Sequence, residues 1–171
     1  AAGMMIVPRH VLGGPGYQAP SDRVNIATVG YRHGMGTSNT NALLKLPNVN
    51  IVALCDVDDS EIARKASAKL HAAVPNAVFY KDYRVMLEKQ KDIDGVVIAT
   101  PDHTHAVVTM AAMQLGKHVY VQKPLTRTVS EARALTEAAK RYKVVTQTGN
   151  QGHSAEGVRL IEEWINDGAI G

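Results

Sequence analysis

The sequence predicts an α/β fold of the Rossmann type, a doubly wound parallel sheet of about six strands. From Val24 onward, short runs of apolar and β-branched residues alternate with segments of helical periodicity. These runs are apolar on both faces, as in parallel strands that helices cover on both sides. The connections are short, which favours right-handed crossovers. Six such strands suit the order 3-2-1-4-5-6, in which ligands bind at the carboxyl ends of the strands where the winding reverses.

The expected strands follow each other at regular distances along the chain. They cover residues 24–29, 49–54, 77–80, 95–100, 118–122 and 143–148. The run at 77–80 is the weakest of them because it is only four residues long. Residues immediately after these strands are therefore the ones to inspect for a binding site.

Helical patterns fall between the strands. Asp58 and Glu61 have the spacing of a capping box, followed by an apolar stripe of Ile62, Ala66 and Leu70. Thr128 and Glu131 predict a second capping box, followed by Ala132, Leu135, Ala138 and Tyr142. A helix over residues 104–115 is expected to end at Gly116, and a last helix carries the stripe Val158, Ile161 and Ile165.

Length and composition indicate one globular domain, at residues 23–171, behind an N-terminal arm at residues 1–22. Because the net charge is only +3 and Lys and Arg form no long block, no nucleic-acid partner is expected. No apolar run is long enough to span a bilayer. Cys55 is the only cysteine, so an intrachain disulfide is impossible.

The arm begins with seven mostly apolar residues and continues with a Gly/Pro-rich run at residues 13–20. One interpretation is the tail of an export signal, which ends in small residues, and it predicts a periplasmic or exported protein. The other is an arm or strap on the domain surface, which leaves a cytoplasmic location open.

A glycine-rich turn follows the first strand, with the sequence Gly30-Tyr31-Arg32-His33-Gly34-Met35-Gly36. Such turns let a pyrophosphate approach the backbone at a helix N-terminus. The spacing departs from the usual G-x-G-x-x-G, so a purely structural turn is the alternative.

Asp56 supports a dinucleotide site because it ends the second strand, 26 positions after Gly30. A carboxylate there binds the adenosine ribose and repels a 2′-phosphate, which favours NAD over NADP. Arg32 argues in the other direction, since a guanidinium could accommodate that phosphate.

Two further polar segments follow later strands. The segment Thr100-Pro101-Asp102-His103-Thr104-His105 contains H-x-H, but no other ligands stand at metal spacing, so no metal site is expected. A structural histidine at a helix start is the alternative. Gln122-Lys123-Pro124 follows the fifth strand, where Lys123 could act as acid or base. We expect His33, His118 and His153 to be scattered surface or loop residues.

These features together resemble the Gfo/Idh/MocA oxidoreductase family over residues 23–171. The most specific part is TPDHTHAVVTMAAMQLGKHVYVQKPLTRTVSEARAL at residues 100–135, which is similar to the family's T-P-[ND]-x-x-H helix and G-K-H-V-x-x-E-K-P segment. Gln122 replaces the usual Glu, which removes a negative charge beside Lys123 and would change its acid–base behaviour or the ribose contacts. The segment GNQGHS at residues 149–154 resembles a subgroup that also carries Q-K-P and is often exported.

The resemblance implies NAD as cofactor, Lys123 as the catalytic residue, and a small carbohydrate-like substrate. The cofactor-binding residues it implies, together with the turn, are Gly30, Arg32, Gly34, Met35, Gly36, Asp56, Thr100, Pro101, His103, His105, Gln122 and Lys123.

The resemblance also implies a second α+β domain, which the 171 residues would lack, and homo-oligomers among full-length relatives. Three functions remain open. They are hydride transfer between the nicotinamide and a sugar or cyclitol hydroxyl, a redox-neutral NAD-dependent glycosidase or lyase, and a non-catalytic nucleotide-binding fragment.

Overall fold

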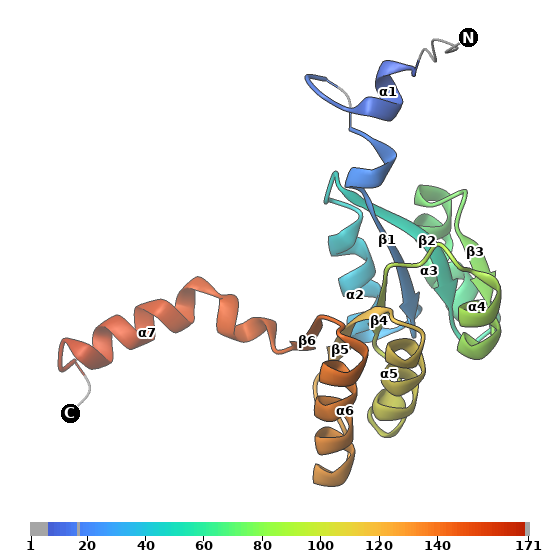
Figure 1. Ribbon diagram of the computed structural model, residues 1–171. Helices are drawn as coiled ribbons and strands as arrows, with labels where there is room; N and C mark the ends of the chain where they lie inside the picture. Colours follow the sequence, from blue (N-terminus) through green and yellow to red (C-terminus); the bar gives the residue numbers. More distant parts are fainter. Residues whose placement is uncertain (1–6, 17, 170–171) are drawn as a thin grey trace.

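The computed structural model describes residues 7–16 and 18–169. It contains one six-stranded parallel sheet in the order β3-β2-β1-β4-β5-β6 (Figure 1). The strands are β1 (Val24–Val29), β2 (Val49–Cys55), β3 (Val78–Tyr80), β4 (Gly95–Ile98), β5 (His118–Gln122) and β6 (Thr146–Gly149). The winding reverses at β1, which pairs with β2 on one side and β4 on the other. The predicted Rossmann topology is confirmed.

The helices alternate with the strands as expected. They are α1 (Arg9–Leu12), α2 (Gly34–Leu43), α3 (Glu61–Ala73), α4 (Tyr83–Lys89), α5 (His105–Gln114), α6 (Val129–Tyr142) and α7 (Glu156–Asn166). Three short 3-10 turns complete the described chain, η1 (Pro20–Asp22), η2 (Asp102–Thr104) and η3 (Gln151–Ser154). Among the described residues, no helix combines the length and apolarity needed to cross a membrane.

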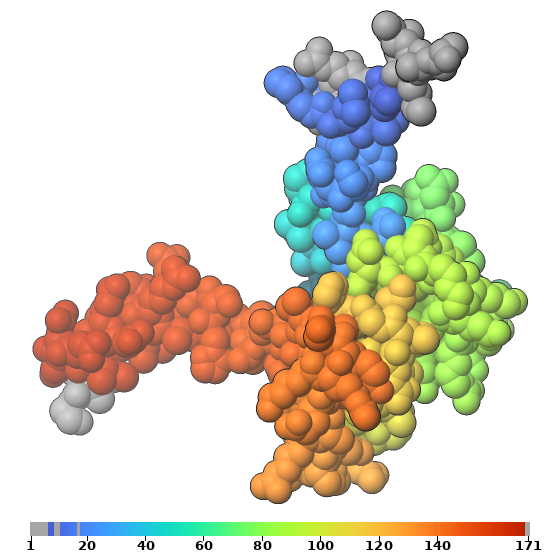
Figure 2. Space-filling view, viewed as in Figure 1, coloured from blue at the N-terminus to red at the C-terminus, as the bar shows by residue number. Residues whose placement is uncertain are grey.

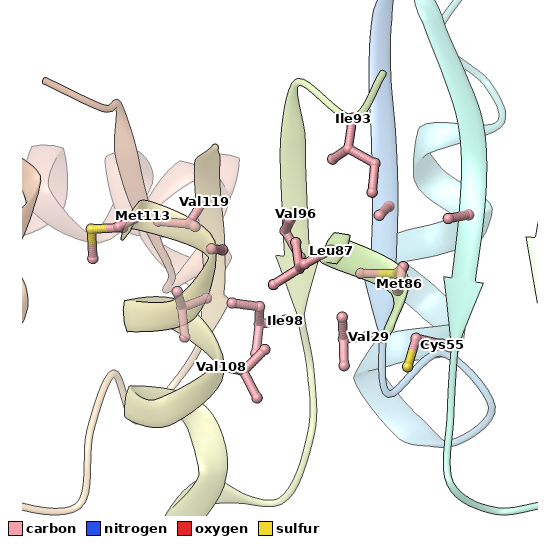
Figure 3. Packing of buried hydrophobic residues seen from close by; sticks show 14 of the residues in the cluster. Val29, Cys55, Met86, Leu87, Ile93, Val96, Ile98, Val108, Met113 and Val119 are labelled. Carbon is pink, nitrogen blue, oxygen red and sulfur yellow. The ribbon is translucent and has the colours of Figure 1, made fainter. Parts of the chain in front are cut away.

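The hydrophobic core has two parts, one on each face of the sheet. The larger part packs side chains of α4, α5 and α6 against β1, β4 and β5, with Met86 near Val29, Val108 near Ile98 and Met113 near Val119 (Figure 3). The smaller part, on the face covered by α2 and α3, contains Tyr31, Ile51, Leu54, Leu70, Val74 and Ala77. Burial on both faces explains why the strands are apolar throughout.

Local signals account for most helix boundaries. The capping box predicted at Thr128 is present. The Thr128 hydroxyl accepts the N–H of Glu131, and the Glu131 carboxylate accepts the N–H of Thr128. The box predicted at Asp58 is wrong, because Ser60 caps α3 by accepting the N–H of Ala63. Helix α4 was not predicted. Its seven residues are too few to show a helical period.

Two strands start or end differently from the prediction. The run expected at 95–100 ends at Ile98, so Thr100 lies in the turn beyond the sheet. The run expected at 143–148 begins only at Thr146, because Lys143 takes a left-handed conformation (φ 54°) that ends α6. Both strands are therefore shorter than the apolar runs that predicted them.

Two segments project from the rounded body (Figure 2). The described part of the predicted N-terminal arm forms α1 and η1 beyond the amino end of β1 (Figure 1). Residues 1–6 and 17 of that arm lie outside the described residues. Helix α7 extends away at the other side, and none of its residues is buried.

Candidate functional site

The site lies at the carboxyl ends of the central strands, as the topology requires. A cleft of about 460 Å³ opens there between the ends of β1, β2, β4 and β5. Most of the predicted cofactor residues line it, namely Gly30, Gly34, Met35, Asp56, Thr100, Pro101, His105, Gln122 and Lys123. Arg32 and Gly36 do not, and His103 lines a second cavity of about 400 Å³ that shares Asp56 and Thr100 with the cleft.

The three glycines of the turn serve different purposes. Gly30 has a positive φ of 81°, and a Cβ there would lie 2.6 Å from the carbonyl oxygen of Ala99. A Cβ on Gly36 would collide with the carbonyl oxygen of Gly30, so β1 and α2 can cross only without a side chain. At Gly34, in contrast, a Cβ would meet nothing within 4 Å. Gly30 and Gly36 therefore allow the fold, whereas Gly34 leaves its open side clear for a ligand.

Helix α2 presents its N-terminus to the cleft. Its N-cap residue is His33, whose side chain makes no capping hydrogen bond. Gly34 and Met35, the first two helical residues, both line the cleft. Backbone N–H groups and the helix dipole make this end a favourable place for a pyrophosphate.

Asp56 is fixed by the backbone on both sides. Its Oδ2 accepts the N–H of Arg32 at 2.9 Å, and its Oδ1 accepts the N–H of Asp58 at 3.0 Å. Each carboxylate oxygen keeps a further lone pair, so ribose hydroxyls can still donate to it. The carboxylate is thus oriented between the cleft and the second cavity.

The side chain of Arg32 is turned into the protein and is only 9% exposed. Its Nε donates to the hydroxyl of Tyr31 at 2.8 Å, and its Nη1 donates to the carbonyl of Asp58 at 2.6 Å. It is the backbone of Arg32, through Asp56, that reaches the site. The guanidinium itself ties the glycine turn to the loop after β2.

His33 is an exposed loop residue, as expected, and it also forms part of the cleft wall. Its Nε2 lies 2.6 Å from Oδ2 of Asp58. Hydrogen bonds from the backbone of Ser60 and from His33 lower the pKa of Asp58 to about 2. The only sequence signal for this pair was their position after strands β1 and β2. His118 is exposed, as expected, and its Nδ1 accepts the N–H of Val145 at 2.9 Å.

Two buried polar atoms in the cleft lack a protein partner. They are Oγ1 of Thr100 and Nε2 of Gln122. Gln122 is only 4% exposed, and its Oε1 accepts the N–H of Lys123 at 3.1 Å. Buried polar groups without a partner are costly, so these atoms indicate a ligand with complementary polar groups. The ribose and carboxamide of a nicotinamide nucleotide provide such groups.

His105 contacts two of the turns that form the site. It is 1% exposed, with Nδ1 at 2.6 Å from the carbonyl oxygen of Pro124 and Nε2 at 2.8 Å from that of Thr100. Both oxygens can only accept, so a neutral ring donates to one of them at a time. The contact joins the turns after β4 and β5. This geometry favours the structural interpretation of the H-x-H segment.

Lys123 is exposed at the boundary between two cavities. It lines the cleft and also a neighbouring cavity of about 590 Å³, whose wall includes Asn150, Gln151 and His153. His153 is an exposed residue after β6, as expected, and it also lies near the site. Within the part of the chain that the structure describes, no group of three or more His, Cys, Asp or Glu could hold a metal ion.

Comparisons with known proteins agree with this geometry. The sequence model of a family described as "Oxidoreductase family, NAD-binding Rossmann fold" matches residues 24–150. Inositol 2-dehydrogenase of Salmonella typhimurium is 31% identical over 143 residues, which cover 81% of this chain and 41% of that protein. A "Glycosyl hydrolase family 109 protein" of Saccharopolyspora erythraea is 32% identical over 154 residues, 87% of this chain and 32% of that protein.

The fold also matches solved structures. Scyllo-inositol dehydrogenase from Lactobacillus casei, with bound NAD(H) and scyllo-inositol, aligns with a TM-score of 0.73 at 22% identity. The alignment covers 87% of this chain and 42% of that one. At this identity the likeness shows the fold. The chain spans less than half the length of each of these proteins.

Proposed function

Since this chain belongs to the Gfo/Idh/MocA family of oxidoreductases and carries its NAD-binding Rossmann domain, we propose that the cleft positions NAD in a dehydrogenase acting on a sugar or cyclitol hydroxyl. The observation that carries the proposal is the convergence of the glycine turn, Asp56, Thr100 and Gln122 at one end of the sheet. The nicotinamide, when bound, would exchange the hydride with the substrate carbon.

Each group of the chain has a distinct task in this proposal. The N-terminus of α2 at Gly34 binds the pyrophosphate. The fixed carboxylate of Asp56 accepts hydrogen bonds from the adenosine ribose. Thr100 and Gln122, whose buried polar atoms lack protein partners, bind the nicotinamide half.

Lys123 is the proposed acid–base residue. It lies where the cleft meets the neighbouring cavity, so a substrate in that cavity would be next to its ammonium group. From there Lys123 can hold the reacting hydroxyl and exchange its proton. The amide side chains of Asn150 and Gln151 in the cavity wall suit a polyhydroxylated substrate.

Isothermal titration calorimetry with NAD tests cofactor binding. We expect saturable binding by the wild-type chain and at least tenfold weaker binding by Asp56→Ala, because the ribose hydroxyls lose their acceptor. Asp167→Ala removes an exposed carboxylate after α7 and serves as the control. The proposal fails if the wild-type chain gives no saturable heat, or if Asp56→Ala binds like the control.

A second candidate is a redox-neutral glycosidase, which the similarity to the glycosyl hydrolase family 109 protein favours. In that case the sugar would be oxidised, cleaved and reduced again, with no net change in NAD. A full-length relative with the same Gln-Lys-Pro segment distinguishes the two. Accumulation of NADH supports the dehydrogenase, whereas glycoside cleavage without NADH supports the glycosidase.

A further inference from the structure

The edge of the cleft beside Asp56 carries three cationic side chains that all pair with one carboxylate. Asp59 Oδ1 lies 3.0 Å from Nε of Arg64 and 3.6 Å from Nη1 of Arg32, and its Oδ2 lies 2.6 Å from Nζ of Lys81. The three cations come from the glycine turn, from α3 and from the segment after β3. Asp59 thus gathers charges that are far apart in the sequence.

This cluster adjoins the place where the adenosine ribose would be held. Asp56, the proposed ribose ligand, is three residues before Asp59 and accepts the N–H of Arg32. Lys81 and Asp56 line the same cavity. A substituent on the ribose hydroxyl that Asp56 binds would therefore be next to Lys81, which Asp59 holds in an ion pair.

A site that binds a 2′-phosphate needs cations of this kind that are not already paired with carboxylates. The phosphate adds nearly two negative charges at neutral pH, and sites that accept it present a guanidinium or ammonium with unused donors. Here Arg32 is committed to Tyr31 and the Asp58 carbonyl, and Arg64 and Lys81 are paired with Asp59. The three cations are balanced by three carboxylates, those of Asp56, Asp58 and Asp59.

We propose that Asp59 is a specificity-determining residue, which favours NAD over NADP by keeping Arg32, Arg64 and Lys81 in ion pairs. It is a positioning residue, because it acts through these cations, whereas Asp56 acts on the ribose itself. The inference rests on the proposed binding of NAD in the cleft. It assigns NAD preference to a residue that no sequence motif singled out.

Removing the Asp59 charge should cost the fold little. The side chains of Arg64 and Lys81 are 63% and 73% exposed, and ion pairs this exposed contribute little to stability. Lys81 would then be free to turn toward a phosphate, whereas Nε of Arg64 keeps its hydrogen bond to the carbonyl oxygen of residue 59. Asp59→Asn keeps the shape of the side chain and leaves the cluster with one net positive charge.

Calorimetric titration of NAD and NADP into matched variants tests the inference. We expect Asp59→Asn to raise the affinity for NADP relative to NAD by about tenfold, and added salt to reduce this gain because the cations are exposed. Asp59→Glu keeps the charge and should retain the wild-type ratio. Glu137→Gln is the control, because it removes the charge of another exposed ion pair, that of Glu137 with Lys140 on α6.

The readout is the ratio of the two dissociation constants, which a merely structural role of Asp59 would not move. An Asp59→Asn ratio within twofold of wild type, or an equal change in Glu137→Gln, overturns the inference while NAD binding stands. If the wild-type chain binds neither nucleotide, the proposed function fails and this inference with it.

Discussion

Gly34 and Gly36 are two residues apart in the same turn, yet they differ in what a side chain would meet. In Gly36→Ala the new Cβ would collide with the carbonyl oxygen of Gly30, so the crossing of β1 and α2 must open. We expect the free energy of unfolding to fall by about 3 kcal/mol. In Gly34→Ala only the positive φ of 49° is strained, at about 1 kcal/mol, while NAD binding is lost. Urea unfolding measures the stability of both variants. Equal losses of stability in the two variants would contradict the different roles assigned to Gly34 and Gly36.

The buried Tyr31 pairs with the half-buried His71. The oxygen of Tyr31 accepts from Nε of Arg32, and its hydroxyl lies 2.8 Å from Nε2 of His71. Burial, and after it the charge of Arg32, lowers the pKa of His71 from its ordinary value of 6.5. The imidazole is therefore held in its neutral form, as a partner for the phenol.

This lowered pKa predicts a pH dependence of stability. Near pH 6 the unfolded chain binds a proton at His71 more readily than the folded chain, so unfolding takes up protons. The contribution to stability is complete above the ordinary pKa and declines as the pH falls through it. We expect the free energy of unfolding to fall less between about pH 7.5 and 5.5 in His71→Gln than in wild type. Identical declines in urea titrations would exclude His71 as the source.

At the scale of elements, α6 depends on its first turn. Thr128 accepts the N–H of Glu131, whose carboxylate accepts the N–H groups of Arg127 and Thr128. Thr128→Ala should cost about 1 kcal/mol, measured by urea unfolding. Thr136→Ala, in the middle of the same helix, should change the stability by less than about 0.5 kcal/mol. Similar effects at the two positions would argue against a capping role.

The elements also show what the sequence can and cannot predict. The limits of α6 followed from Thr128 and from the apolar stripe, since both are local signals. The end of β4 and the start of β6 could not be predicted in this way. Apolar residues follow β4 and precede β6 without belonging to the strands, so composition does not mark these two boundaries. The sequence does not predict helix α4, because the helix is too short to show a periodic pattern. It is stabilised by the packing of Met86 and Leu87 in the core.

The same division holds for the site. Strand ends identified Asp56, Thr100 and Lys123, because parallel topology brings these ends together. The sequence could not reveal that the guanidinium of Arg32 turns inward or that Asp59 pairs with three cations, since Arg32 and Lys81 are 27 and 22 residues from Asp59. Side-chain direction is decided by packing, which spacing does not encode.

At the scale of the whole molecule, α7 contributes little to the folded body. Its apolar side chains, including Val158, Ile161, Trp164 and Ile165, are 41% to 54% exposed. An isolated helix of this length is marginal in water, so burial of this stripe is what would stabilise it. Deleting residues 155–171 should change the free energy of unfolding by less than about 0.5 kcal/mol.

Thermal or urea unfolding of the shortened chain measures this effect. Leu135→Ala shows that the measurement is sensitive, since this core residue is 4% exposed and its truncation should cost about 3 kcal/mol. A loss above about 1 kcal/mol on deleting α7 would mean that the helix packs on the body.

The reversal of winding at β1 has a consequence for synthesis on the ribosome. β1 lies in the middle of the sheet, yet its second neighbour, β4, is 69 residues later, from Val29 to Ile98. At ordinary translation speeds this stretch takes roughly 3 to 14 s to emerge. During that time one edge of β1 has no partner strand, and nascent chains are exposed to aggregation there. Cofactor binding cannot assist this stage, because half of the cleft has not yet been made.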